Sequence, residues 1–304
     1  DRLVKEFQKW DVDFIIVHNK SDIKKLKDDI LIGVRQKYNK EIIDFSTIDL
    51  YNRDKLIEII KNNIPESAYR FNTLVGDILN QGDIVLLITP IDAEAPEGRL
   101  ILPQVQVIRD ILDNECIAIV MKEREIDSFL KKTKIKPKLA ITDSQVFPKA
   151  AAALPNDVWL TSFSIVLARY KGDFQRYLMG TPKISELKDG DKILILESCS
   201  HQISCDDIGR VKIPRWLSNF TGKKLEYIVV AGLDKIPGEI TDYSLIVQCG
   251  GCVVTKKQLI NRLKPAIEAN VPITNYGMLI SYVHGIYNRA VAPFTDNIDE
   301  DNYL

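Results

Sequence analysis

Short runs of apolar and β-branched residues alternate with amphipathic stretches along the whole chain. In the first part, the runs at 12–18 and 41–45 predict two strands. Residues 52–62 predict a helix, because Leu56, Ile59 and Ile60 fall on one helical face. The pattern switches from strand to helix and back, which is typical of α/β proteins.

The same alternation continues to the end of the chain. Further strands are predicted at 82–88, 116–121, 139–142, 158–160, 192–196, 227–231 and 244–247. Helices are predicted at 102–112, 214–220 and 256–269. We therefore expect three consecutive α/β units with mainly parallel sheets, at 1–66, 67–162 and 163–304.

Composition narrows the class of protein. Of the 304 residues, 45% are hydrophobic and 27% charged, which suits a folded protein with a real core. The net charge of -1 gives no basic field for nucleic acid or anionic membranes. No apolar run reaches the roughly 20 residues that span a bilayer, and the first residues do not read as a signal peptide. The composition predicts a cytosolic protein with neither a nucleic-acid nor a membrane partner.

The segment from Phe14 to Asp22 reads as a buried strand that runs into Asn-Lys-Ser-Asp. Ligands of open α/β sheets bind at the carboxyl ends of strands, where this motif falls. There Asp22 can accept hydrogen bonds from the two donors of a guanine edge. Asn19 can connect neighbouring loops by hydrogen bonds, and the Lys20 side chain can cover the face of the base. A helix N-cap after a strand explains the motif equally well.

A weaker indication of guanine binding is that Ser46 and Thr47 end the next strand, where backbone amides would meet the base oxygen. The phosphate half of a GTPase has no counterpart, since the sequence holds no G-x-x-x-x-G-K-[ST] loop for phosphates and magnesium. We therefore expect no GTP hydrolysis by these residues. We hypothesise that they are the remainder of a longer protein whose phosphate-binding half lies upstream.

Four of the five cysteines lie between 199 and 252. Cys199 and His201 follow one predicted strand, and Cys249 and Cys252 follow another as Cys-Gly-Gly-Cys. If these strands are parallel neighbours, three thiols and an imidazole meet at one sheet edge. Thiolates select soft or borderline metals, so a structural zinc and an iron–sulfur cluster are equal candidates, with a redox dithiol as a third. The remaining thiols, Cys205 and Cys116, read as a spare thiol and a small core residue.

Several segments together resemble the HydF family of FeFe-hydrogenase maturation GTPases. They are Asn19–Asp22, Gly82–Asp92, Ala95–Gln104, Thr142–Gln145, the Cys-x-His and Cys-x-x-Cys motifs, and Asn275–Gly277. The resemblance covers essentially the whole chain. It implies a truncated GTPase domain, a dimerisation domain and a C-terminal cluster-binding domain.

The resemblance implies a scaffold with a 4Fe-4S cluster on Cys199, Cys249 and Cys252. The scaffold receives a diiron precursor made with two radical-SAM maturases and delivers it to the apo-FeFe-hydrogenase. His201 is then the candidate for an exchangeable fourth ligand, with water or Glu197 as alternatives. Gln248 departs from a common family form that has His before Cys-x-x-Cys.

The resemblance also implies a homodimer or higher homo-oligomer, and GTP, magnesium and GTPase activity in the full-length protein. Two rival classes remain: a GTP-regulated protein with a structural Cys3His zinc site, and an electron-transfer iron–sulfur protein. Metal identity separates these three functions. The middle unit shows no catalytic constellation, because Asp83, Asp92 and Glu94 read as solvated turn residues.

Overall fold

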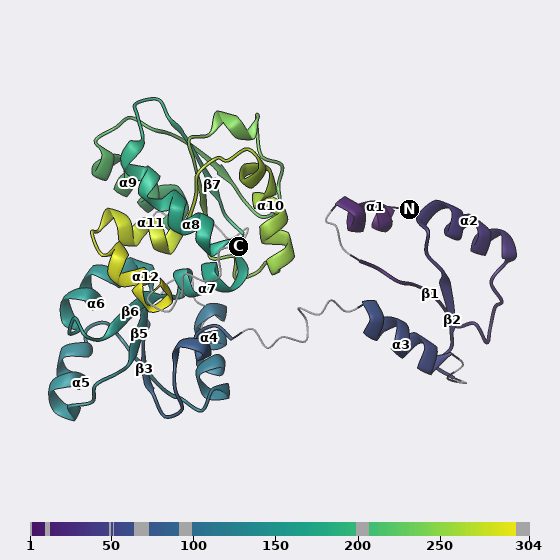
Figure 1. Ribbon diagram of the computed structural model, residues 1–304, viewed down its shortest axis with the longest axis horizontal. Coiled ribbons are helices and arrows are strands. Elements are labelled where there is room, and N and C mark those ends of the chain that lie inside the picture. The colour runs from purple at the N-terminus through teal and green to yellow at the C-terminus, as the bar shows by residue number, and fades with distance from the viewer. Residues whose placement is uncertain are drawn as a thin grey trace. The chain divides into compact units, whose positions relative to one another are not determined.

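The computed structural model describes residues 2–9, 13–48, 50, 52–63, 73–90, 99–198 and 207–295. They form two compact units, Asp1–Asn72 and Thr73–Leu304 (Figure 1). All strand pairs in the described ranges are parallel, within one two-stranded and two four-stranded sheets. The predicted α/β class with parallel sheets is confirmed.

The first unit is built around a pair of short strands. Its helices are α1 (Arg2–Lys9), α2 (Asp28–Tyr38) and α3 (Arg53–Asn63), and its strands are β1 (Ile16–Asn19) and β2 (Ile42–Phe45). His18 lies opposite Asp44 in the register, and His18 Nδ1 lies 2.7 Å from Asp44 Oδ1. The parallel pairing brings the loops after β1 and β2 to the same edge.

The first four-stranded sheet occupies one half of the second unit. Its elements are β3 (Ile84–Ile88), α4 (Leu102–Asp113), β4 (Ile117–Met121), α5 (Ile126–Thr133), β5 (Leu139–Thr142), α6 (Phe147–Ala153) and β6 (Trp159–Ser162). The strand order is β4-β3-β5-β6. All residues of β5 and most of β3 are buried, as expected for strands covered by helices on both faces.

The second four-stranded sheet follows. Its elements are α7 (Phe163–Lys171), α8 (Phe174–Gly180), β7 (Lys192–Leu196), α9 (Ile213–Thr221), β8 (Glu226–Val230), β9 (Leu245–Gln248), α10 (Lys256–Glu268), β10 (Ile273–Asn275), α11 (Tyr276–Val283) and α12 (Tyr287–Thr295). Its order, β10-β9-β7-β8, repeats the arrangement of the first sheet. In both sheets the first two strands are neighbours and the third lies on the other side of the first.

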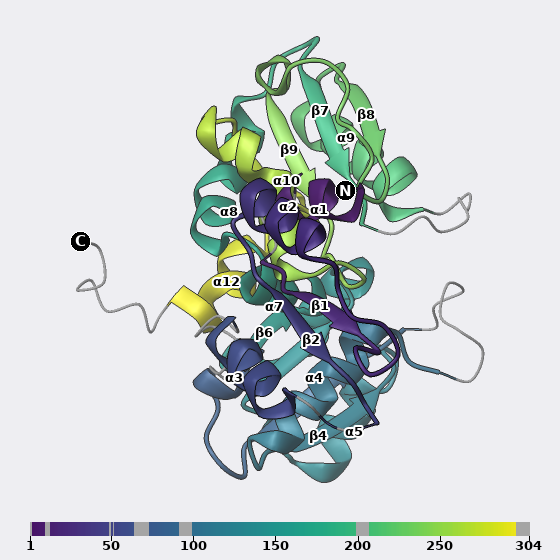
Figure 2. The same ribbon diagram turned by 90° about the vertical axis from the view of Figure 1, so that its right-hand side faces the viewer.

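The two halves of this unit share one hydrophobic core. The same buried cluster contains Leu86 and Ile141 of the first sheet and Leu194 and Ile246 of the second. Helix α12 packs back on β6, and the Arg289 guanidinium donates to four main-chain carbonyls of the first half. Figure 2 shows β7, β8 and β9 toward one end of this unit, β4 toward the other, and α7 between them.

Five short helical turns complete the described elements. They are Gly76–Ile78, Ser144–Val146, Thr181–Glu186, Ile208–Lys212 and Ile240–Asp242. Two of them, Ser144–Val146 and Ile208–Lys212, flank the cavity described below. Across the described ranges, no helix is both long and apolar enough to cross a bilayer.

Candidate functional site

The Cys-Gly-Gly-Cys loop lies at the carboxyl edge of the second sheet. Strands β8 and β9 flank β7 on opposite sides, so the chain changes direction around β7, and such a switch point is where open α/β sheets form clefts. Cys249 directly follows β9, and its backbone N–H donates to Leu196 O at 3.0 Å. The parallel pairing of β7 with β9 thereby places Cys249 beside the end of β7.

The loop is held in place by its backbone and by a buried lysine. Gly251 has φ +67°, and a Cβ at this position would lie 2.6 Å from Leu259 Cδ1, so any other residue would be strained there. Lys171 Nζ donates to the carbonyls of Gly251 at 2.7 Å, Cys252 at 3.2 Å and Val254 at 3.0 Å. Burial lowers the pKa of Lys171. These contacts fix the direction in which the loop leaves the sheet.

Cys249 is surrounded by hydrogen-bonding groups. The backbone N–H of Ser198 donates to Cys249 Sγ at 3.1 Å, and Ser198 Oγ lies 3.0 Å from the same sulfur. Burial raises the pKa of the Cys249 thiol, whereas the hydrogen bonds from Ser198 and the Gly251 backbone act in the opposite direction. Donors of this kind favour the thiolate, which is the form that binds metals.

Gln248 supports this arrangement from inside the sheet. The side chain is fully buried, and its Nε2 donates to Ser198 Oγ at 3.1 Å and to Cys249 O at 3.2 Å. Gln248 therefore orients Ser198, which in turn contacts the sulfur. The residue that departs from the common family pattern has a positioning role in this chain.

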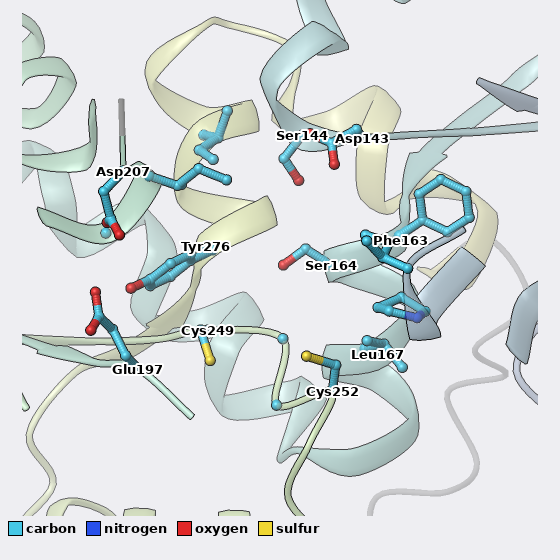
Figure 3. A pocket seen from close by; sticks show the side chains of 17 residues that line it. Asp143, Ser144, Phe163, Ser164, Leu167, Glu197, Asp207, Cys249, Cys252 and Tyr276 are labelled. Atoms are coloured by element: carbon cyan, nitrogen blue, oxygen red, sulfur yellow. The ribbon is translucent and has the colours of Figure 1, made fainter. Parts of the chain in front are cut away.

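The two cysteines face a cavity of about 200 Å³ between the two halves of the unit. Figure 3 shows Cys249 and Cys252 on one side, Asp143 and Ser144 on the opposite side, and Ser164 between them. Ser144 Oγ is buried and has no hydrogen-bond partner among the described residues. The apolar lining includes Ile101, Pro103, Phe163, Leu167 and Ile280. A small ligand here would meet two thiols and a few oxygen groups inside apolar walls.

Three carboxylates border this cavity. Glu197, the fourth-ligand alternative from the sequence, is buried and pairs with Arg210, whose Nη2 lies 2.9 Å from Glu197 Oε2. Asp207 Oδ1 accepts from the Arg210 backbone at 2.8 Å, and Asp143 Oδ1 accepts from Gln145 N at 2.9 Å. The sequence motifs do not mark Asp143 as a ligand, although the Thr-Asp-Ser-Gln pattern that contains it belongs to the resemblance.

The other predicted ligands, Cys199 and His201, lie outside the described residues, as does Cys205. Cys199 directly follows Ser198 in the chain, and Ser198 contacts Cys249. Within the described residues, no group of three His, Cys, Asp or Glu side chains forms a metal site. The described donors, two thiols with main-chain and hydroxyl donors beside them, fit a soft-metal or cluster site.

The predicted guanine-recognition residues lie together at one edge of the first unit. Ser21 N donates to Phe45 O at 3.2 Å and joins the loops after β1 and β2. Asn19 Oδ1 accepts from Lys20 N at 2.8 Å, so Asn19 acts within its own loop. Ser46 is buried, and its Oγ accepts from Ile48 N at 3.1 Å. Asp22 and Thr47 are exposed at the same edge.

The residues of the middle unit that the sequence analysis singled out, where described, have structural roles. Asp83 Oδ2 accepts from Asn80 N at 2.8 Å within a turn, as its sequence context predicts. Cys116 is a buried core residue whose thiol donates to Asn80 O at 3.2 Å, which confirms its interpretation as a core residue. Asp92 and Glu94 lie outside the described residues.

The fold and the cavity define a protein of two packed α/β halves that carries a dithiol loop at a sheet edge. Residues 74–172 match the hydrogen maturase F dimerization domain, and residues 175–293 match the hydrogen maturase F tetramerization domain. The chain belongs to the hydrogen maturase F family, which confirms the resemblance drawn from the motifs.

Comparison with curated proteins finds no match. Among solved structures, an ABC transporter solute-binding protein from Burkholderia multivorans is similar at 13% identity, over 65% of this chain and 79% of that one. The TM-score of this comparison is 0.21. At that value the similarity supports no conclusion about this chain.

Proposed function

We propose that this chain is a scaffold that carries a 4Fe-4S cluster, accepts a diiron precursor and transfers it to apo-FeFe-hydrogenase. Membership of the hydrogen maturase F family supports a role in hydrogenase maturation. One observation supports the proposal of cluster binding and transfer: the loop of Cys249 and Cys252 faces a cavity between the two α/β halves. The precursor would come from the two radical-SAM maturases.

Cys249 and Cys252, together with Cys199, would hold the cluster as thiolates. When bound on three thiolates, a 4Fe-4S cluster supplies one iron with an exchangeable ligand. His201, Asp143 and Glu197 are the side chains proposed for that exchangeable position. The backbone N–H of Ser198 donates to the Cys249 sulfur and would stabilise its thiolate. The apolar walls formed by Phe163, Leu167 and their neighbours limit access of water.

Anaerobic reconstitution of the protein with iron and sulfide tests the proposal. We expect iron and sulfide in the stoichiometry of one 4Fe-4S cluster, and an EPR signal at low temperature after reduction with dithionite. Metal analysis of the protein as purified without added metal serves as the control. A single tightly bound zinc ion with no cluster formation would overturn the scaffold proposal in favour of a structural zinc protein.

For the first unit we propose the base-recognition half of a GTP site. Asn19, Lys20 and Asp22 would face the guanine base, and Ser46 and Thr47 would bring main-chain amides to it. Their common location at the carboxyl edge of β1 and β2 supports this role. GTP with magnesium belongs to the full-length protein in this proposal.

Family membership also supports a homo-oligomer. Strand β4 is the outer strand of its sheet among the described residues, so one side of its backbone lacks a strand partner there. Ile117 is 50% and Val120 44% exposed on this strand, and Leu112 is 52% exposed on the adjacent α4. We propose that a second copy of the chain covers this edge, because the dimerization-domain match includes these residues.

Val120→Lys is expected to weaken this self-association at least tenfold, about 1.4 kcal/mol, because it buries a charge in an apolar interface. Sedimentation equilibrium of the variant and the wild type measures the change. Ile57→Lys is the matched control, since Ile57 is 43% exposed on α3 and lies outside both oligomerisation-domain matches. An unchanged dissociation constant for Val120→Lys would rule out the β4 edge as the interface.

A further inference from the structure

We propose that two buried cations, Lys171 and Arg262, are the counter-charges of the cluster and raise its reduction potential. The inference rests on the proposed function, because it assigns a role to charges beside the proposed Cys249 and Cys252 ligands. These cations reach the site from α7 and α10, which lie on either side of the two-cysteine loop in the sequence.

Lys171 is held as an ammonium ion. Its residue is only 8% exposed, and its Nζ contacts the three carbonyls of Gly251, Cys252 and Val254. An ammonium group has three N–H bonds, one for each acceptor, whereas a neutral amine has only two. The arrangement therefore places a full positive charge directly against the backbone of the proposed ligand loop.

Arg262 brings a second charge to the same place. The residue is 8% exposed, and its guanidinium donates to Glu197 O at 2.6 Å and to Val230 O at 2.9 Å. These carbonyls belong to the carboxyl ends of the neighbouring strands β7 and β8. Arg262 therefore contacts the end of β7, from which the chain continues to Cys199.

Neither cation forms a salt bridge with a carboxylate among the described residues. No salt bridge of the described residues includes Lys171 or Arg262, and Glu197, the buried acid nearest in sequence to Cys199, pairs with Arg210 instead. A buried cation without a paired anion is costly, and an anionic cluster held by the adjacent loop and strand end would offset that cost. A 4Fe-4S cluster on three thiolates carries a net negative charge and satisfies that requirement.

The expected consequence concerns electron transfer to the cluster. Reduction adds a negative charge, and nearby positive charges favour the reduced form, so the potential is higher with the cations than without them. A role confined to holding the loop would change cluster retention and protein stability but leave the potential of the bound cluster unchanged. The potential therefore separates an electrostatic role from a structural one.

The test is an EPR-monitored redox titration of the reconstituted full chain as wild type, Lys171→Gln, Lys171→Arg and Arg262→Gln. We expect each Gln variant to lower the ratio of reduced to oxidised cluster at a fixed potential by about tenfold, equivalent to about 59 mV for a one-electron couple. Lys171→Arg should keep the wild-type potential. Lys256→Gln, an exposed lysine at the start of α10, is the matched control and should also leave the potential unchanged.

The outcomes are distinct. Gln variants that form a cluster at the wild-type potential refute the counter-charge role while the scaffold proposal stands. Should Lys171→Gln not fold, Arg262→Gln with a lowered potential supports the inference, and Arg262→Gln with an unchanged potential overturns it. A wild-type protein that forms no cluster at all refutes the proposed function and this inference with it.

Discussion

Cys249→Ser is expected to abolish stable cluster binding. The sulfur sits at the end of β9, where it accepts from the Ser198 backbone N–H and lies 3.0 Å from Ser198 Oγ, so the site is arranged around a sulfur at this position. A serine oxygen is a hard, weakly acidic ligand that binds iron–sulfur clusters poorly. Loss of residues that merely support ligands costs about 10–100-fold in metal affinity, and loss of a ligand should exceed that.

Iron content after anaerobic reconstitution and desalting measures this effect. Cys116→Ser is the matched control, because Cys116 is buried in the core of the first half and lies outside the cavity lining. We expect Cys116→Ser to lose some stability but to retain iron. Circular dichroism of each apo-protein shows whether the fold is kept. Wild-type iron retention in a folded Cys249→Ser protein would remove this residue from the ligand set.

Gly180→Ala is expected to cause the largest loss of stability from adding a single methyl group. Gly180 ends α8 where the helix packs on β10, and a Cβ would lie 2.8 Å from Ile273 N and closer still to the carbonyl oxygen of that residue. These are main-chain atoms of a buried strand, so no side-chain rotation can relieve the clash. Overpacking typically costs about 1–3 kcal/mol, and here we expect about 3 kcal/mol, or about 6–12 °C in Tm.

Thermal unfolding of the full chain measures that loss. Gly33→Ala is the matched control, because nothing lies within 4 Å of a Cβ at Gly33 in the interior of α2. Alanine favours a helix by about 1 kcal/mol over glycine, so this variant should be as stable as the wild type or more so. Equal Tm values for Gly180→Ala and wild type would show that α8 can move away from β10 at little cost.

Most strands could be predicted because each corresponds to a continuous run of apolar residues in the sequence. Lys192–Leu196, for example, has four consecutive buried apolar residues, and the run alone indicates a central strand. Strand β10 was not predicted. It has only three residues, Ile273–Asn275, two of them polar, and all three are buried through tertiary contacts. Short elements of this kind carry too little pattern to be recognised locally.

The prediction of the site from local sequence patterns is limited in the same way. The spacing of Cys249 and Cys252 after a predicted strand was enough to indicate a ligand loop, and the structure places that loop at the sheet edge. Lys171 lies 80 residues before Gly251, and nothing in its sequence context marks it as a partner of the loop. Asp143 and Ser144 likewise join the cavity only through the packing of one sheet against the other. The contribution of the first sheet to the site depends on tertiary packing that one sequence does not reveal.

The contact between Lys171 and the two-cysteine loop crosses from one family domain to the other. Lys171 ends α7 within the dimerization-domain match, whereas Gly251, Cys252 and Val254 lie within the tetramerization-domain match. With the shared core and the contacts of Arg289, this contact makes Thr73–Leu304 one compact unit. In an assembly joined through β4, the thiol loop would therefore keep a fixed distance from the symmetry axis. If the chain transfers a diiron precursor as proposed, transfer would then depend on the approach of the apo-hydrogenase and not on a hinge between these halves.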